Sequence, residues 1–120
     1  MTIIGKIYAN WCGHCKQLEP QWEKMKQQIN NKNIKYIEIE EQEHKKLNNF
    51  RKQYPSLQIN GYPTIFKIYP NKTIEYFNKD RIANVMKQWA TKKIVPKTVN
   101  KRNFRKKYSK TIKKKNYFYM

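Results

Sequence analysis

The chain has 120 residues and a formal net charge of +19 at pH 7, so it is long enough for one small domain with a modest core. Apolar residues make up 38% of the sequence and aromatic residues 14%, which excludes a chain that is disordered throughout. The charge is unevenly spread: residues 96–120 hold 10 Lys and Arg and no acid, whereas residues 1–95 hold 17 basic and 8 acidic residues. This change predicts a folded domain over 1–95 and a basic C-terminal arm over 96–120.

The N-terminal residues bear on location. Residues 1–9 are too short and too strand-like for a signal peptide, and no apolar run approaches the roughly 20 residues of a membrane span. We therefore expect a cytoplasmic protein without a transmembrane segment. Lys, Asn and Ile supply 23, 13 and 14 residues, a bias typical of an AT-rich genome such as that of a large DNA virus. With such a source, the expected location is the virion or virus factory.

The apolar pattern predicts strands and helices in the order βαβαββα. In chain order they are a strand over 2–9 that is buried on both faces, a helix from about Cys12 to residue 30, a strand over 34–39, a helix that contains Leu47, Phe50 and Tyr54, a hairpin of 64–69 and 73–77, and a helix from about Asp80. A helical crossover predicts that the first two strands are parallel, and the hairpin adds an antiparallel pair. The expected fold class is α/β, with a four-stranded mixed sheet flanked by helices.

Two of the predicted helices carry clear apolar stripes. The stripe of the first helix has spacings of four, three and four and consists of Leu18, Trp22, Met25 and Ile29. Pro20 lies inside this helix, where proline favours a kink. The stripe of the last helix consists of Ile82, Val85, Met86 and Trp89. Asp80 is the predicted N-cap of that helix.

Both cysteines, Cys12 and Cys15, lie in the segment Trp-Cys-Gly-His-Cys-Lys at residues 11–16. A disulfide between them closes only a tiny loop and stabilises the fold little, so the pair predicts redox chemistry. In a reducing cytosol such a pair is more often catalytic or metal-binding than structural. A zinc site would need Cys12, Cys15, His14 and His44, but closed zinc sites usually have a second ligand pair at motif spacing. We expect no metal and no cofactor.

The chain resembles the thioredoxin superfamily and, within it, the catalytic domains of protein disulfide isomerase. The resemblance covers roughly residues 3–93 and is carried by Tyr-Ala-Asn-Trp-Cys-Gly-His-Cys-Lys at 8–16, by Gly-Tyr-Pro-Thr at 61–64, and by Leu18, Pro20, Trp22 and Glu23. It implies a thioredoxin-like fold and a thiol–disulfide oxidoreductase that acts on protein thiols and disulfides. An unidentified redox partner would reset the cysteines, and that partner and the compartment decide between reductase, oxidase and isomerase. Glutathione-dependent reduction is an alternative, although glutaredoxins prefer Pro-Tyr between the cysteines.

The resemblance also implies a role for each residue of the motif. Cys12, at a helix N-terminus that stabilises its thiolate, is the expected nucleophile. Cys15 is expected to resolve the mixed disulfide, so that the two residues form a redox-active disulfide. Gly13 and His14 complete the Cys-Gly-His-Cys motif. A His14 imidazolium favours the dithiol form and moves the potential from about −270 mV, as in thioredoxin, toward about −180 mV, as in protein disulfide isomerase.

Substrate contact is implied for three other residues. Pro63 matches the family's cis-proline, which faces the cysteines. The backbone of Tyr62, which precedes it, is expected to pair with an extended substrate chain. Trp11 is expected to present an apolar face to the substrate, although a lone Trp is also compatible with the core.

The sequence departs from the family at several positions. Lys6 stands where the family has a buried acid that moves protons for the resolving thiol. As a cation it could lower a thiol pKa, as a base it could accept a proton, and the slightly favoured interpretation is that it extends to solvent. Arg81 matches a loop arginine, with Lys79 in place of a glycine, and either lowers the pKa of Cys15 or pairs with surface acids. The family's first strand and helix are missing, so the strand at 34–39 is expected to be an exposed edge, covered by the arm or by a second subunit.

The basic arm is the basis of a competing function. Its aromatic residues alternate with candidate polyanion-binding residues, namely Lys101, Arg102, Arg105, Lys106, Lys107, Lys113, Lys114 and Lys115. Basic and aromatic side chains together suit phosphate contact and base stacking. The alternative function is therefore a redox-fold binding module that attaches to nucleic acid or another anionic surface. The arm is either solvated or a basic amphipathic helix built on Phe104, Tyr108 and Ile112.

Overall fold

The computed structural model describes residues 1–92, which form four strands and three helices in the predicted order. The elements are β1 (Thr2–Tyr8), α1 (Gly13–Gln28), β2 (Ile34–Glu40), α2 (His44–Gln53), β3 (Thr64–Ile68), β4 (Ile74–Tyr76) and α3 (Ala83–Thr91). The predicted boundary at residue 95 and the basic arm lie outside the described residues. Within residues 1–92, no helix combines the length and the apolar character that crossing a membrane requires.

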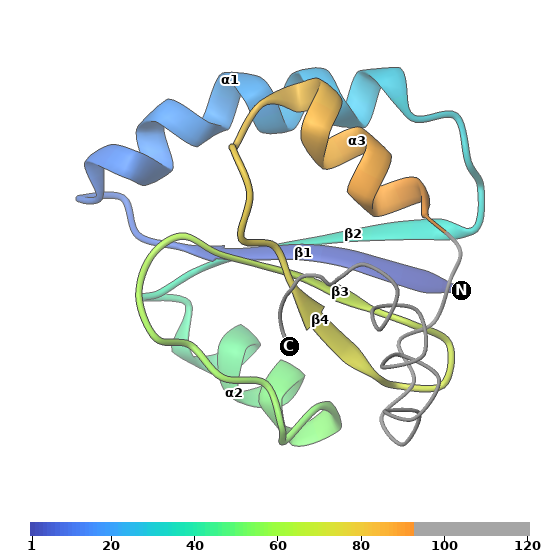
Figure 1. The fold of residues 1–120 in the computed structure, drawn as a ribbon. Coiled ribbons are helices and arrows are strands. Elements are labelled where there is room, and N and C mark those ends of the chain that lie inside the picture. The colour runs from blue at the N-terminus through green and yellow to red at the C-terminus, as the bar shows by residue number, and fades with distance from the viewer. Residues whose placement is uncertain (93–120) are drawn as a thin grey trace, which may run out of the picture.

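The strands form one mixed sheet in the order β2-β1-β3-β4. β1 pairs with β2 in parallel, while β1 with β3 and β3 with β4 are antiparallel. Helices α1 and α3 cover one face of the sheet and α2 covers the other (Figure 1). The predicted α/β fold with a four-stranded mixed sheet is therefore confirmed. β2 lies at one edge of this sheet, as expected, but the arm proposed to cover it is not among the described residues.

Alternation along β1 divides the core into two layers. Ile4 faces α1 and α3, where it packs against Leu18, Trp22 and Met86, and Ile7 faces α2. Gly5 also lies on the α2 side, opposite Phe66 of β3. A Cβ atom at Gly5 would come within 2.3 Å of the Phe66 ring, so the close approach of that ring requires glycine.

The start of α3 corrects the predicted cap. The helix begins at Ala83, with Ile82 as the N-cap residue and no capping bond from a side chain at that position. Asp80 is therefore not the N-cap. The free N–H of Ala83 instead donates a hydrogen bond to Oε1 of Gln21 on α1, at 2.9 Å. Ile82, predicted to face the core, lies outside the helix and is 50% exposed.

The end of α3 is held by a buried lysine. Lys67 on β3 is 1% exposed, and its Nζ donates hydrogen bonds to the carbonyl oxygens of Trp89, at 2.9 Å, and Lys92. Carbonyl groups at the end of a helix lack intrahelical donors, and a cation there also complements the helix dipole. Lys67 therefore fixes α3 to the sheet.

Candidate active site around Cys12 and Cys15

Cys12 is the N-cap residue of α1, which agrees with the predicted helix start. Its sulfur accepts a hydrogen bond from the backbone N–H of Cys15 at 3.2 Å. As a thiol, Cys12 also donates to the carbonyl oxygen of Tyr62 at 3.4 Å. The first N–H groups of a helix have no intrahelical partners, so they are available to stabilise a thiolate at this position.

The surroundings of Cys12 favour its thiolate. Burial alone would raise the pKa of Cys12, since the residue is only 6% exposed. Hydrogen bonds from the Cys15 thiol and from the backbone N–H groups of Cys15 and His14, together with the charge of Arg81, outweigh this effect. The net result is a pKa of Cys12 below the ordinary value for a thiol.

Cys15 has the opposite character. It is also 6% exposed, and burial, the hydrogen bond with Cys12 and the negative charge of Cys12 raise its pKa to about 11. The backbone of Ala9 and the charge of Lys6 act in the other direction but do not compensate. Both cysteines are free thiols. The site thus holds one thiol that ionises readily beside one that stays protonated at neutral pH.

The loop that contains Tyr62 and Pro63 lies against the cysteines. The Tyr62–Pro63 peptide bond is cis, and Tyr62 packs against the cluster of Ala9, Cys12 and Cys15. Trp11 is 65% exposed, so it is not a core residue. Its ring meets that of Tyr62 edge to face, with centroids 5.8 Å apart. Trp11 and Tyr62 therefore form an aromatic surface next to Cys12.

Glutamates at the end of β2 hold this region in place. Glu40 is 7% exposed and accepts hydrogen bonds from the backbone N–H groups of Asn10, at 2.9 Å, and Gln42, at 2.7 Å. Glu41 accepts a hydrogen bond from Nε1 of Trp11. Neither glutamate was among the residues predicted from the sequence, although an acidic run directly after a predicted strand was a usable signal. They tie the segment before Cys12 to β2.

His14 and Arg81 are both exposed, and both lie in the wall of one surface cavity. This cavity has a volume of about 270 Å³ and is lined by His14, Gln17, Leu18, Lys79, Asp80 and Arg81. The charge of Arg81 lowers the pKa of Cys12, whereas the two roles considered from the sequence were an effect on the pKa of Cys15 and pairing with surface acids. Gly13 is the first residue of α1, and a Cβ atom there would meet open space.

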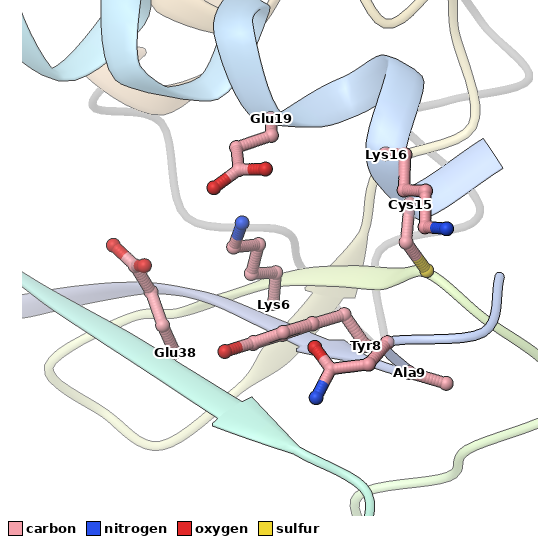
Figure 2. Close-up of a pocket in the computed structure, with 8 residues that line it drawn as sticks. Lys6, Tyr8, Ala9, Cys15, Lys16, Glu19 and Glu38 are labelled. Atoms are coloured by element: carbon pink, nitrogen blue, oxygen red, sulfur yellow. The ribbon is translucent and has the colours of Figure 1, made fainter. Parts of the chain in front are cut away.

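Lys6 is buried, so the expectation that it extends to solvent is wrong. It is 5% exposed, and its Nζ lies 4.8 Å from the ring centroid of Tyr8 and 5.3 Å from that of Trp22. A cavity of about 230 Å³ contains Lys6 and Cys15 in its wall. Figure 2 shows the ammonium pointing toward Glu19, with Glu38 on its other side. The structure thus brings Lys6 into the surroundings of Cys15.

The remaining predicted residues lie elsewhere. Within residues 1–92, no three His, Cys, Asp or Glu side chains form a group that could hold a metal ion. His44 begins α2, on the opposite face of the sheet from α1 (Figure 1), so it does not join Cys12 and Cys15. The proposed polyanion-binding residues between Lys101 and Lys115 lie outside the described part of the chain.

Comparisons with known proteins agree on one family. The family model described as "Thioredoxin" matches residues 1–92. The protein disulfide-isomerase of Drosophila melanogaster is 32% identical over 96 residues, which cover 78% of this chain and 18% of that protein. The protein disulfide-isomerase of Oryctolagus cuniculus is 28% identical over 90 residues, which cover 73% of this chain and 16% of that protein. The chain therefore spans less than a fifth of the length of these relatives.

Solved structures share the fold. The solution structure of the first thioredoxin domain of mouse protein disulfide-isomerase A4 has a TM-score of 0.57 at 23% identity, and the match covers 82% of this chain and 69% of that one. The crystal structure of the J-Trx1 fragment of ERdj5 has a TM-score of 0.61 at 18% identity, and covers 74% of this chain and 41% of that one. From the family match and the shared fold it follows that this chain belongs to the thioredoxin family and is similar to domains of protein disulfide isomerases.

Proposed function

We propose that this chain is a thiol–disulfide oxidoreductase that exchanges disulfides with protein substrates through Cys12 and Cys15. The observation that carries the proposal is a pair of free thiols at the start of α1, where Cys12 is the N-cap residue and its sulfur accepts a hydrogen bond from the backbone N–H of Cys15 at 3.2 Å. These surroundings lower the pKa of Cys12, while that of Cys15 is raised to about 11. A nucleophile must be a thiolate to attack a disulfide, and a resolving thiol should stay protonated until the mixed disulfide has formed. Relatives named protein disulfide-isomerase support the same assignment.

The exchange proceeds in two steps. The Cys12 thiolate attacks one sulfur of a substrate disulfide, the substrate S–S bond breaks, and the other substrate sulfur leaves with the electron pair and takes up a proton. Cys15 then loses its proton and attacks Sγ of Cys12. This forms the Cys12–Cys15 disulfide and releases the second substrate thiol. The chain is oxidised by two electrons and the substrate is reduced; the reverse sequence donates a disulfide.

Substrate is proposed to bind along Tyr62 and Trp11. The carbonyl oxygen of Tyr62 lies 3.4 Å from Sγ of Cys12, so an extended chain that pairs with this backbone places its own sulfur near the nucleophile. The exposed Trp11 ring, held by Glu41 and Tyr62, offers apolar surface to the neighbouring substrate residues. Apolar contact of this kind suits unfolded or partly folded proteins, which expose hydrophobic side chains.

Insulin reduction and refolding of a scrambled-disulfide substrate test the proposal on the full chain. Cys12→Ser should reduce both rates to those of the uncatalysed reactions, because the attacking sulfur is gone. Cys15→Ser should accumulate a mixed disulfide through Cys12, because no thiol remains to release it. His44→Ala, on the opposite face of the sheet, is the control and should retain both activities. Full activity of the Cys12→Ser variant would overturn the proposal.

The direction of exchange and the cellular location are further proposals. A His14 imidazolium, two residues from Cys12 in the sequence, would favour the dithiol form and a potential nearer about −180 mV than about −270 mV. Equilibration with glutathione buffers measures this potential directly. The location, in the cytoplasm or in a virion or virus factory, is inferred from the sequence alone.

A second candidate function rests on the basic arm. Residues 96–120 hold 10 positive charges and no acid, which favours attachment to nucleic acid or another polyanion. Binding of the full chain to double-stranded DNA should weaken steeply with salt and should be lost when the eight candidate residues from Lys101 to Lys115 are replaced by Gln. Equal binding by the wild-type and substituted chains would contradict this function.

A further inference from the structure

The cavity beside Cys15 contains a buried cation without a direct partner. Within residues 1–92, Nζ of Lys6 takes part in none of the hydrogen bonds or ion pairs that the side chains form, although the residue is only 5% exposed. It reaches into the cavity of about 230 Å³ whose wall also includes Cys15, Glu19 and Glu38 (Figure 2). A water needs roughly 30 Å³. The cavity therefore has room for several waters between the ammonium and the thiol.

The resolving step needs a water-accessible cavity beside Cys15, because Cys15 must lose a proton before it can attack Sγ of Cys12. The Cys15 thiol is almost fully buried, so its proton has to leave through the cavity that Cys15 lines. The surroundings must therefore stabilise the thiolate while it exists and carry the proton away. The groups that share the cavity with Cys15 must therefore both stabilise the thiolate and accept the proton.

Lys6 meets the first requirement. Its Nζ lies over the rings of Tyr8 and Trp22, 4.8 and 5.3 Å from their centroids, and aromatic faces stabilise a cation. The ammonium points toward the Glu19 carboxylate (Figure 2), and Glu38 lies directly opposite Lys6 in the register of β1 and β2. The positive charge of Lys6 in turn favours a negative charge on Cys15.

Glu19 meets the second requirement better than Glu38 does. Glu38 accepts hydrogen bonds from Nε1 of Trp22 at 2.9 Å and from Nζ of Lys26 at 2.6 Å, and its pKa is lowered because these bonds outweigh its burial. Glu19 makes no hydrogen bond or ion pair in the described part of the chain. It follows Cys15 by four residues on α1, which places both on one side of the helix, at the open cavity.

We propose that this cavity is the proton route of the resolving cysteine, in which Lys6 provides a fixed positive charge that stabilises the Cys15 thiolate and Glu19 accepts the proton through cavity water. The proposal rests on the oxidoreductase function proposed above. The proton passes from Sγ of Cys15 to a water, which gives a proton to the Glu19 carboxylate. The Cys15 thiolate then forms the bond to Sγ of Cys12, and the bond between Cys12 and the substrate sulfur breaks with its electron pair on that sulfur. Glu19 returns its proton to solvent.

The charge of Lys6 is tested in a Cys12→Ser background, where Cys15 is the remaining cysteine. Lys6→Met should shift the pH dependence of Cys15 alkylation by iodoacetamide upward by on the order of 0.5 pH unit, which makes the reaction about threefold slower at a fixed pH below the midpoint. Lys6→Gln, which keeps a polar group, should have the same effect if Met disturbs the fold. Lys16→Met is the matched control: it removes an exposed charge from the wall of the same cavity and should cause a smaller change.

This readout separates the inference from the oxidoreductase proposal, because alkylation does not require a substrate. An unchanged or faster reaction in both Lys6 variants would overturn the role of Lys6, whatever the activity of the wild-type chain. Circular dichroism of each variant verifies that the fold is retained.

Glu19→Gln tests the proton acceptor with two readouts that should move in opposite directions. Loss of a negative charge near Cys15 should leave alkylation of Cys15 as fast or slightly faster, while loss of the acceptor should slow the resolving step about tenfold. The resolving step is followed on the full chain after Cys12 is loaded with Ellman's reagent, since Cys15 then releases a coloured thiolate without any protein substrate. Glu23→Gln, on α1 and paired with Lys26, should change neither rate. Release from Glu19→Gln that is as fast as from the wild-type chain would overturn the role of Glu19.

Discussion

Two buried lysines on neighbouring strands face the same side of the sheet and have different surroundings. Lys67 on β3 is 1% exposed and Lys6 on β1 is 5% exposed. The ammonium of Lys67 donates to two carbonyl groups at the end of α3. The ammonium of Lys6 has two aromatic faces beside it and a cavity in front of it, with no hydrogen bond to another residue in the described range.

The two lysines differ in what compensates the burial of their charge. A buried charge is expensive unless hydrogen bonds replace its hydration. Lys67 meets that condition within the fold, and burial nevertheless lowers its pKa. Lys6 depends on the cavity for its hydration, and Cys15 lies in the wall of the same cavity. We therefore expect changes at Lys67 to act on stability and changes at Lys6 to act on thiol chemistry.

The largest expected effect on stability is that of Lys67→Met. The substitution leaves the carbonyl groups of Trp89 and Lys92 without their donor, and the free energy of unfolding should fall by about 2 kcal/mol. Urea denaturation followed by circular dichroism measures the loss. Lys35→Met, an exposed lysine on β2, is the matched control and should change stability by less than about 0.5 kcal/mol. Equal losses in the two variants would remove the structural role of Lys67.

Glu38→Gln should have the next largest effect, because Glu38 joins Lys26 and Trp22 next to Lys6. At neutral pH the free energy of unfolding should fall by about 1 kcal/mol. Burial raises the pKa of Glu38, but its hydrogen bonds lower the pKa by a larger amount. The pKa of Glu38 in the folded state therefore lies below the unfolded value. The stabilisation is therefore present above the unfolded pKa and is lost as the pH falls through the folded pKa.

The wild-type and Glu38→Gln chains should accordingly converge in stability under acidic conditions. Urea denaturation at a series of pH values checks this convergence. A difference that stays constant, or grows, as the pH falls would contradict the assigned cause of the pKa shift.

Lys6→Met should have the smallest effect on stability. The variant loses two cation–π contacts, each worth about 0.5–1 kcal/mol, but it no longer buries a charge that lacks a direct partner. These effects oppose each other, so the free energy of unfolding should change by less than about 1 kcal/mol. The measurement is the same denaturation experiment. A loss of free energy of unfolding as large as that of Lys67→Met would mean that Lys6 supports the fold in the same way. That result would contradict the difference between the two lysines.

The two lysines also illustrate what the sequence could predict. Apolar periodicity predicted the strands and helices, and the Cys-Gly-His-Cys segment predicted where the candidate site lies, because both depend on residues close together in the chain. The contacts of Lys67 depend on carbonyl groups 22 and 25 residues away, and no local pattern marks them. The burial of Lys6 depends on how closely α1 lies over β1, which the sequence does not specify.

The predicted N-cap of α3 was wrong because it too depends on a contact between residues far apart in the sequence. Asp80 has the residue type and the place of an N-cap, which is a local signal. The helix nevertheless begins at Ala83, whose N–H donates a hydrogen bond to Oε1 of Gln21 on α1. Packing of α1 against α3 therefore decides where the helix starts. Glu40, which holds the segment before Cys12, likewise gains its role only when β2 lies beside β1.

The most direct test of the whole account is the reactivity of the two cysteines in the reduced, full-length chain as a function of pH. Alkylation by iodoacetamide, read for each cysteine by mass spectrometry, should show Cys12 reacting with a midpoint below that of an ordinary thiol, because its pKa is lowered. Cys15 should stay largely unmodified until the pH approaches its pKa of about 11. Two cysteines that react together near the ordinary pKa of a thiol, or Cys15 reacting before Cys12, would contradict the division into nucleophile and resolving thiol.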